Sequence, residues 1–319
     1  MTPAGTATQH RTGGSLSFVW DEALGMLSDP LMQRALLVAL LVGLVAPVVG
    51  TYLVQRRLSL LGDGIGHVAL TGVALGWVVG SVANLAPRDA LALPGAVVAA
   101  LVGAVLIEFL RDRGAVSGDV VLALLFYGGI AGGVLLIGVA GGTSANLTAY
   151  LFGSISTVTT GDLVLTAALS VLILTIGLGL RSALFTVSQD PEFARSSGLP
   201  VQQLNITVAV LAALTVTVAM RVVGVLLVSA LMIVPVAIAQ LLTTSFRRTM
   251  AIAMTIGVSV CVTGLTITYW NNVSPGATIV LLAIGLYAVL GPARGLVRRP
   301  YPAQTHPDQA DDVVVNGGR

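Results

Sequence analysis

The feature that most constrains this chain is a succession of long apolar stretches. A helix needs about 20 mostly apolar residues to cross the hydrocarbon core of a bilayer. Only 9% of the residues are charged and 55% are hydrophobic, whereas soluble domains carry roughly 25% charged residues. We therefore predict an all-α polytopic membrane protein with about nine transmembrane helices, which begin near Leu31, Leu61, Leu91, Asp119, Asp162, Leu204, Val222, Thr249 and Ala277. Eight or ten spans remain open, because only Arg221 divides the apolar run from Leu204 to Leu242.

The distribution of arginine predicts how the spans are oriented. Cytoplasmic connections of membrane proteins carry an excess of basic residues. With nine spans, one set of connections and the C-terminal flank hold Arg56, Arg57, Arg111, Arg113, Arg181, Arg195, Arg247, Arg248, Arg294, Arg298 and Arg299, and the other set holds Arg34, Arg88 and Arg221. We expect the N-terminus outside and the C-terminus in the cytoplasm of a cell-membrane protein. The expected parts are a flexible extracytoplasmic extension (1–29), a transmembrane domain (30–297) and a disordered cytoplasmic tail (298–319).

Two absences restrict the function. All 16 basic residues are arginine, so the chain cannot form a P-loop, whose lysine reaches the nucleotide phosphates. The H-E-x-x-H motif of an intramembrane zinc protease is also missing. We predict a transport component without its own ATPase, no permanently bound cofactor and no nucleic-acid partner. Any ATP hydrolysis is expected in a separate chain.

Asp63 and His67 stand inside the second apolar stretch, where ionisable groups are costly. Residues four apart share one helix face, with Cβ atoms about 5–6 Å apart. A carboxylate and an imidazole at that spacing can hold one divalent metal ion. Counted at 1.5 Å per residue from Arg57, Asp63 would lie roughly 9 Å and His67 roughly 15 Å deeper, the latter near mid-bilayer. A proton relay and a hydrogen bond that only fixes helix packing are the alternatives.

The same stretch carries small residues on another face. Gly72, Gly76 and Gly80 repeat every four residues and lie roughly opposite Asp63 and His67 at 100° per residue. Such a small-xxx-small pattern lets two helix backbones approach closely in a membrane. We therefore expect one face of this helix to pack against a neighbour and the other to face a cavity.

Two further polar segments lie on the expected cytoplasmic side. Glu108 has Arg111 three residues on, which predicts a local ion pair. The connection from Arg181 to Asn205 reads as a short helix, since Asp190 can cap it, Pro191 suits its first position and Gly198 can end it. This element is either a docking helix between spans or an ordered surface loop.

Four segments together resemble the permease subunits of the zinc/manganese/iron family of ATP-binding-cassette (ABC) importers. They are "RRLSLLGDGIGHVALTGVALG" (56–76), "LFGSISTVTTGDL" (151–163), "RVVGVLLVSALMIVPVAIAQLL" (221–242) and "SPGATIVLLAIGLYAV" (274–289). The resemblance spans nearly everything between Pro30 and Gly295. It implies a type II ABC importer permease fold, like the vitamin B12 and siderophore permeases without their first helix.

The resemblance also implies partners and roles. It implies a homodimer around a central pathway, two ATPase subunits and one extracytoplasmic metal-binding protein. Asp63 and His67 match the pathway residues of the family. Asp190, Glu192, Ala194 and Gly198 match its coupling segment, as contacts to the ATPase or supports of that helix. We expect a divalent metal importer, with zinc first and manganese or iron as alternatives. A chelate or vitamin permease and a proton- or sodium-coupled transporter remain rival hypotheses.

Overall fold

The computed structural model describes residues 25–84, 90–112, 118–141, 144–154, 158–220, 222–271 and 273–297. The described part contains nine helices that are long and apolar enough to cross a membrane. They are α2 (Pro30–Gln55), α3 (Leu61–Val82), α4 (Ala92–Asp112), α5 (Gly118–Val139), α7 (Thr160–Gly179), α10 (Val201–Ala219), α11 (Val225–Leu242), α12 (Phe246–Trp270) and α13 (Pro275–Val297). Each begins within three residues of its predicted start, so the predicted nine-span, all-helical architecture is confirmed.

Three shorter helices join the spans: α6 (Ser144–Phe152), α8 (Arg181–Gln189) and α9 (Pro191–Ser196). The predicted short helix is α9, whereas α6 and α8 were not predicted, because both are too short for a clear periodic signal. Residues 25–28 of the expected N-terminal extension form a helical turn, and Asp29 caps α2. The remainder of that extension and the expected C-terminal tail lie outside the described residues.

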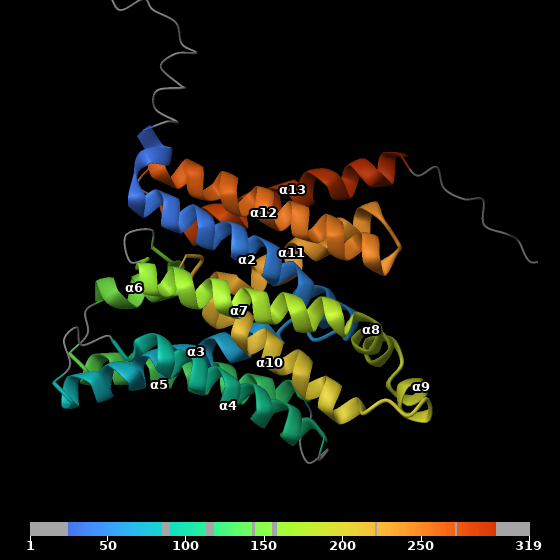
Figure 1. Ribbon diagram of the computed structural model, residues 1–319, viewed down its shortest axis with the longest axis horizontal. Coiled ribbons are helices and arrows are strands. Elements are labelled where there is room, and N and C mark those ends of the chain that lie inside the picture. The colour runs from blue at the N-terminus through green and yellow to red at the C-terminus, as the bar shows by residue number, and fades with distance from the viewer. Residues whose placement is uncertain are drawn as a thin grey trace, which may run out of the picture.

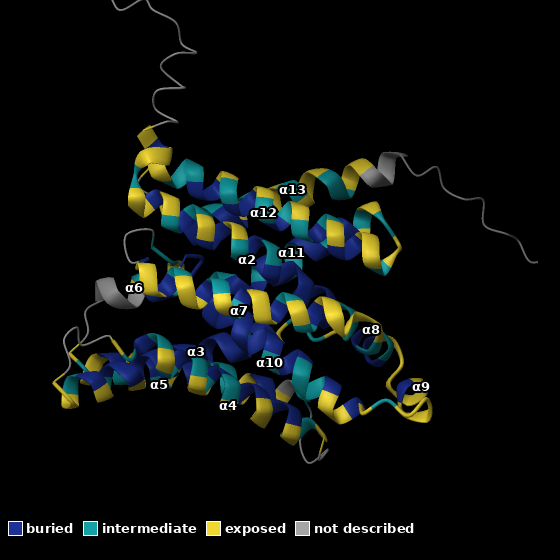
Figure 2. Ribbon diagram, viewed as in Figure 1, coloured by how far each residue is buried: buried dark blue, intermediate teal, exposed yellow. Residues whose placement is uncertain are grey.

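The spans form two groups with two helices between them (Figure 1). In one group, α3 packs between α4 and α5, and in the other, α2 packs against α11 and α12, with α13 alongside α11 and α12. Helices α7 and α10 connect the groups, since α10 contacts α2, α3, α4 and α7. Figure 2 shows the buried residues gathered where α2, α3 and α10 meet. The outer faces of α4, α5, α7 and α13 expose large apolar side chains such as Val102, Leu124, Val171 and Leu281, as helices in lipid do.

The described arginines gather at one end of the bundle. Helices α8 and α9 lie at this end, and α13 finishes on the same side (Figure 1). Arg56, Arg57, Arg111, Arg181, Arg195, Arg247 and Arg248 lie at or next to helix ends there, while Arg34 is in the first turns of α2 at the opposite end. Arg221 lies outside the described residues. We call the first end the arginine-rich end.

Three connections meet through glycine at the end opposite the arginine-rich one. Gly153 and Gly224 have φ angles of 77° and 88°, which side chains with a Cβ rarely adopt. A Cβ at Gly224 would lie 2.3 Å from the carbonyl oxygen of Leu151, and one at Gly276 would lie 1.8 Å from that of Val223. Ser274 Oγ adds a hydrogen bond of 3.0 Å to the carbonyl oxygen of Phe152. This glycine junction (Gly153, Gly224 and Gly276) fixes the start of α11 against α6 and α13.

Candidate metal pathway

Asp63 lies in the first turn of α3 and is half-buried. Its Oδ1 accepts a short hydrogen bond from the hydroxyl of Ser229 on α11. The helix begins only at Leu61, because residues 56–60 form turns in which Arg57 has a φ angle of 56°. At 1.5 Å per residue, Asp63 is about 3 Å and His67 about 9 Å along α3. Both residues therefore lie in the first half of α3, on the side of the arginine-rich end, and their depth in a bilayer stays a prediction.

A cavity of about 320 Å³ lies between α3 and α5 beside Asp63. Asp63 is the acidic residue of its wall, which is otherwise mostly apolar. The other lining residues are Leu60, Gly64, Leu122, Ala123, Phe126 and Tyr127. A carboxylate at an apolar wall gives a cation one anionic contact there and few competing polar groups.

His67 lies one turn further along α3 and is only 2% exposed. The ring of Phe126 packs edge-on against the imidazole, with centroids 4.3 Å apart. The imidazole Nδ1 is buried and has no hydrogen-bond partner among the described residues. His67 is not part of the cavity wall, whereas Phe126 is. The structure thus brings Asp63 to the cavity and keeps His67 behind Phe126.

One chain supplies two candidate ligands. Within the described part of the chain, no group of three or more His, Cys, Asp or Glu residues is placed to hold a metal ion. Carboxylate and imidazole suit Mn²⁺, Fe²⁺ and Zn²⁺, all of which need more than two ligands. Further ligands would have to come from water or from a second chain.

Glycines place α3 against its neighbours on several faces. A Cβ at Gly72 would lie 2.3 Å from the carbonyl oxygen of Gly95, and one at Gly76 would lie 2.1 Å from that of Leu91, so both glycines meet the backbone of α4 or the turn before it. Gly80 is buried on the same helix. On α5, a Cβ at Gly129 would lie 2.5 Å from the carbonyl carbon of His67. Gly129 was not identified from the sequence, although its pairing with Gly133 repeats the small-xxx-small spacing.

An ion-pair cluster stands at the arginine-rich end of α4. Glu108 Oε1 lies 3.6 Å from Arg56 Nη2, and Glu108 Oε2 lies 3.3 Å from Arg111 Nη1. The predicted local pair is confirmed, and Arg56 is an additional partner that sequence spacing could not reveal. Burial lowers the pKa of the Arg56 guanidinium from its usual value, and the Glu108 carboxylate opposes that shift.

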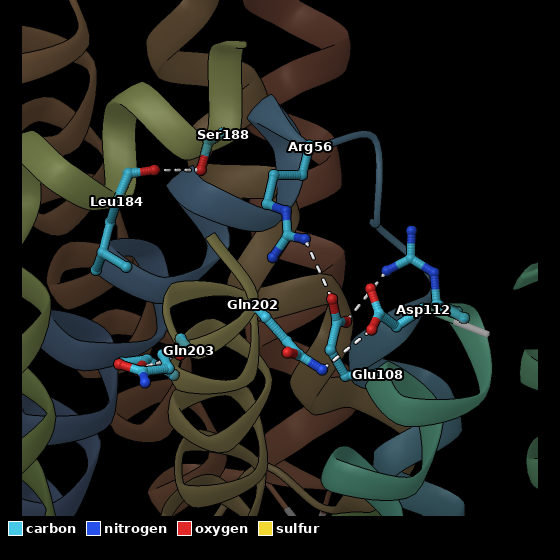
Figure 3. A network of polar contacts seen from close by, with 9 residues as sticks. Arg56, Glu108, Asp112, Leu184, Ser188, Gln202 and Gln203 are labelled. Atoms are coloured by element: carbon cyan, nitrogen blue, oxygen red, sulfur yellow. Dashed lines mark hydrogen bonds and ion pairs between the residues drawn. The ribbon is translucent and has the colours of Figure 1, made fainter. Parts of the chain in front are cut away.

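Two hydrogen bonds near the ion-pair cluster hold the chain on either side of α9. Gln202, in the first turn of α10, donates to Asp112 Oδ2 at 3.0 Å (Figure 3). Gln189, the last residue of α8, forms a short hydrogen bond to Gln55, the last residue of α2. The residues before and after α9 are thereby tied to the ends of α2 and α4.

The α9 segment has the predicted cap and stop. Asp190 Oδ1 accepts from the backbone N–H groups of Glu192 and Phe193 at 3.0 and 2.9 Å, and Gly198 has a φ angle of 79°. Ala194 is 0% exposed within this chain, so it supports the helix rather than presenting a contact. Phe193 is 60% exposed. Phe193 was not identified from the sequence, where a large aromatic residue on a short polar helix was the available signal.

Comparison with known proteins gives the family. The profile of the ABC 3 transport family matches residues 28–291, which is most of the chain. This chain belongs to the ABC 3 transport family. It is therefore a multi-pass permease component of the cell membrane, and in this family the ATPase is carried by separate subunits.

Named relatives and a solved structure support the assignment. The chain is 31% identical to a manganese transport system membrane protein, MntC, of Halalkalibacterium halodurans, over 89% of this chain and 94% of that protein. It is 30% identical to a probable iron transport system membrane protein of Haemophilus influenzae, over 85% and 96% of the two chains. A chain of the solved PsaBC from Streptococcus pneumoniae, in complex with Fab, matches with 32% identity and a TM-score of 0.75, over 85% of this chain and 95% of that chain. The ABC permease fold expected from the resemblance is thus confirmed.

Proposed function

We propose that this chain is the permease subunit of an ATP-driven importer of a divalent transition metal, and that Asp63 and His67 are ligands of the metal in transit. One observation carries the proposal: Asp63 stands at a cavity, and one helical turn away the buried His67 keeps an unpartnered Nδ1. An unpaired polar atom inside a bundle is costly. A site that must release its ion benefits from few ligands, and this chain offers two.

The proposal also concerns which metal is transported. Carboxylate and imidazole do not distinguish Mn²⁺, Fe²⁺ and Zn²⁺. From the sequence we expected zinc first, but the relatives named as manganese transport proteins support manganese, and the relative named as an iron transport protein supports iron next. We propose Mn²⁺ as the first candidate and keep Zn²⁺ and Fe²⁺ as alternatives.

The proposed assembly contains a second copy of this chain, two ATPase subunits and an extracytoplasmic metal-binding protein. The need for more than two ligands supports the second copy, since a twofold axis would double Asp63 and His67. The proposed orientation places the arginine-rich end, with α8 and α9, in the cytoplasm. ATP-driven movement would then reach the spans through the α9 segment and its links to α2 and α4.

Metal uptake tests the proposal. The complete transporter is expressed in cells that lack their own high-affinity importer, and uptake of Mn²⁺, Fe²⁺ and Zn²⁺ is measured separately. Asp63→Ala and His67→Ala are expected to abolish uptake of the transported metal while the transporter still assembles. Asp29→Asn is the matched control, since it changes a carboxylate at the opposite end of the bundle, outside the cavity, and Asn caps a helix about as well as Asp. Normal uptake by both pathway variants would refute the assignment, and loss of assembly would mean that the pair only holds helices together.

A further inference from the structure

We propose that Ser229 is a positioning residue for the metal: its hydroxyl holds Asp63 Oδ1 and leaves Oδ2 to bind the ion. This inference rests on the proposed role of Asp63 as a metal ligand. Ser229 donates to Oδ1 from α11, 166 residues away in the sequence. No described residue donates a hydrogen bond to Oδ2. The carboxylate is thus held on one oxygen, at the wall of the cavity.

Close packing of α3 on α11 enforces this contact. A Cβ at Gly62 would lie 3.3 Å from the Cβ of Ser229, and one at Gly66 would lie 3.3 Å from Cγ1 of Val225. Gly62 and Gly66 lie on the side of α3 that faces α11, so the absence of their side chains brings α11 beside the Asp63 carboxylate. Ser229 is itself only 6% exposed. Its short side chain therefore has little freedom to turn away from Asp63.

Ser229 differs from other buried hydroxyl groups of the bundle in where it donates. Thr51, Ser188 and Thr215 each donate to the carbonyl oxygen four residues earlier in their own helix, at 2.6–2.8 Å. That bond is the ordinary way for a buried Ser or Thr to be satisfied in a helix. Ser229 instead donates to a charged group on another helix. A bond to a charged acceptor is roughly twice as strong as a neutral one, so it can set the carboxylate orientation.

The position of Ser229 also ties the ligand to a fixed point of the fold. Ser229 is on the second turn of α11, which begins directly after Gly224 of the glycine junction. The start of α11 is therefore anchored to α6 and α13. Any displacement of α3 relative to α11 changes the Ser229–Asp63 bond, and the metal-binding orientation of Asp63 changes with it.

The test uses the complete transporter and the metal that the uptake experiment identifies. Initial uptake rates are measured over a range of metal concentrations for Ser229→Ala, Ser229→Thr and Ser170→Ala. Ser170 is a fully buried serine on α7 outside the cavity wall and is the matched control. Ser229→Ala is expected to raise the KM for metal about tenfold, because the Asp63 carboxylate loses the charge-assisted hydrogen bond that orients it. Maximal uptake should stay close to that of Ser170→Ala.

Ser229→Thr retains the hydroxyl and is expected to restore most of the affinity. An unchanged KM in Ser229→Ala overturns the proposal. A lower melting temperature with an unchanged KM also overturns it, because it assigns Ser229 to packing alone. Asp63→Ala in the same assay distinguishes a failure of the Ser229 proposal from a failure of the proposed function. If Asp63→Ala is inactive while Ser229→Ala is normal, only the role of Ser229 fails, and if Asp63→Ala transports normally, the proposed function itself fails.

Discussion

The aromatic ring of Phe126 on α5 lies edge-on against the imidazole of His67 on α3, with centroids 4.3 Å apart and planes at 80°. Phe126 is also part of the cavity wall that contains Asp63. One side chain therefore both covers the imidazole and lines the cavity that Asp63 borders. We expect a metal ion in the cavity to reach His67 only if Phe126 or α5 moves.

Removal of the Phe126 ring should make His67 accessible from the cavity. In Phe126→Ala we expect diethylpyrocarbonate to modify His67 several-fold faster than in the wild type, because the barrier between the imidazole and the cavity is gone. Peptide mass spectrometry measures the rate at His67 separately from His10 and His306. Phe185→Ala is the control, since that ring packs on Phe246 and not on His67. Equal rates in the two variants would show that Phe126 does not shield the imidazole.

The glycine face of α3 should not tolerate a large side chain. In Gly76→Leu the new Cβ would lie 2.1 Å from the carbonyl oxygen of Leu91, so α3 and α4 must separate at a cost of at least about 2 kcal/mol. Gly285→Leu on α13 is the control, because no atom lies within 4 Å of a Cβ built there. Thermal melting in detergent compares the two. Similar melting temperatures would mean that α3 and α4 do not pack at Gly76 in the membrane.

Loss of the Glu108 charge should destabilise the arginine-rich end. Glu108 and Arg56 have side chains only 7% and 11% exposed, and removing one member of a buried pair costs about 3–5 kcal/mol. We expect Glu108→Gln to lower the free energy of unfolding by about that amount, measured in mixed micelles. The double variant Glu108→Gln/Arg56→Gln should lose less than the sum of the two single variants. Strict additivity would contradict an energetic coupling between the two residues.

Two variants of the α9 segment test separately whether it docks on the ATPase and which residue supports the helix. Phe193→Ala removes an exposed ring and should weaken co-purification of the ATPase at least about tenfold, as expected for an aromatic anchor, without changing the melting temperature of the permease. Ala194→Asp places a charge at a fully buried position and should instead lower that melting temperature. Val273→Ala, an exposed position in the connection between α12 and α13, is the control for docking. ATPase retention in Phe193→Ala would remove Phe193 from the docking surface.

The sequence by itself determined the spans, because a membrane helix has to satisfy its backbone hydrogen bonds within one apolar stretch of fixed length. It also determined the cap of α9 and the Glu108–Arg111 pair, which depend on residues two or three positions apart. The sequence also identified Asp63 and His67 as candidate functional residues, since ionisable groups are rare in such apolar stretches.

Only the tertiary structure decided which groups these residues meet. The Ser229–Asp63 bond, the Phe126–His67 contact and the Arg56–Glu108 pair join residues that are 166, 59 and 52 positions apart. No local periodicity encodes such pairs, because they depend on how closely glycine lets the helices approach. The burial of Ala194 was decided in the same way, because the fold of the α9 segment turned its side chain inward.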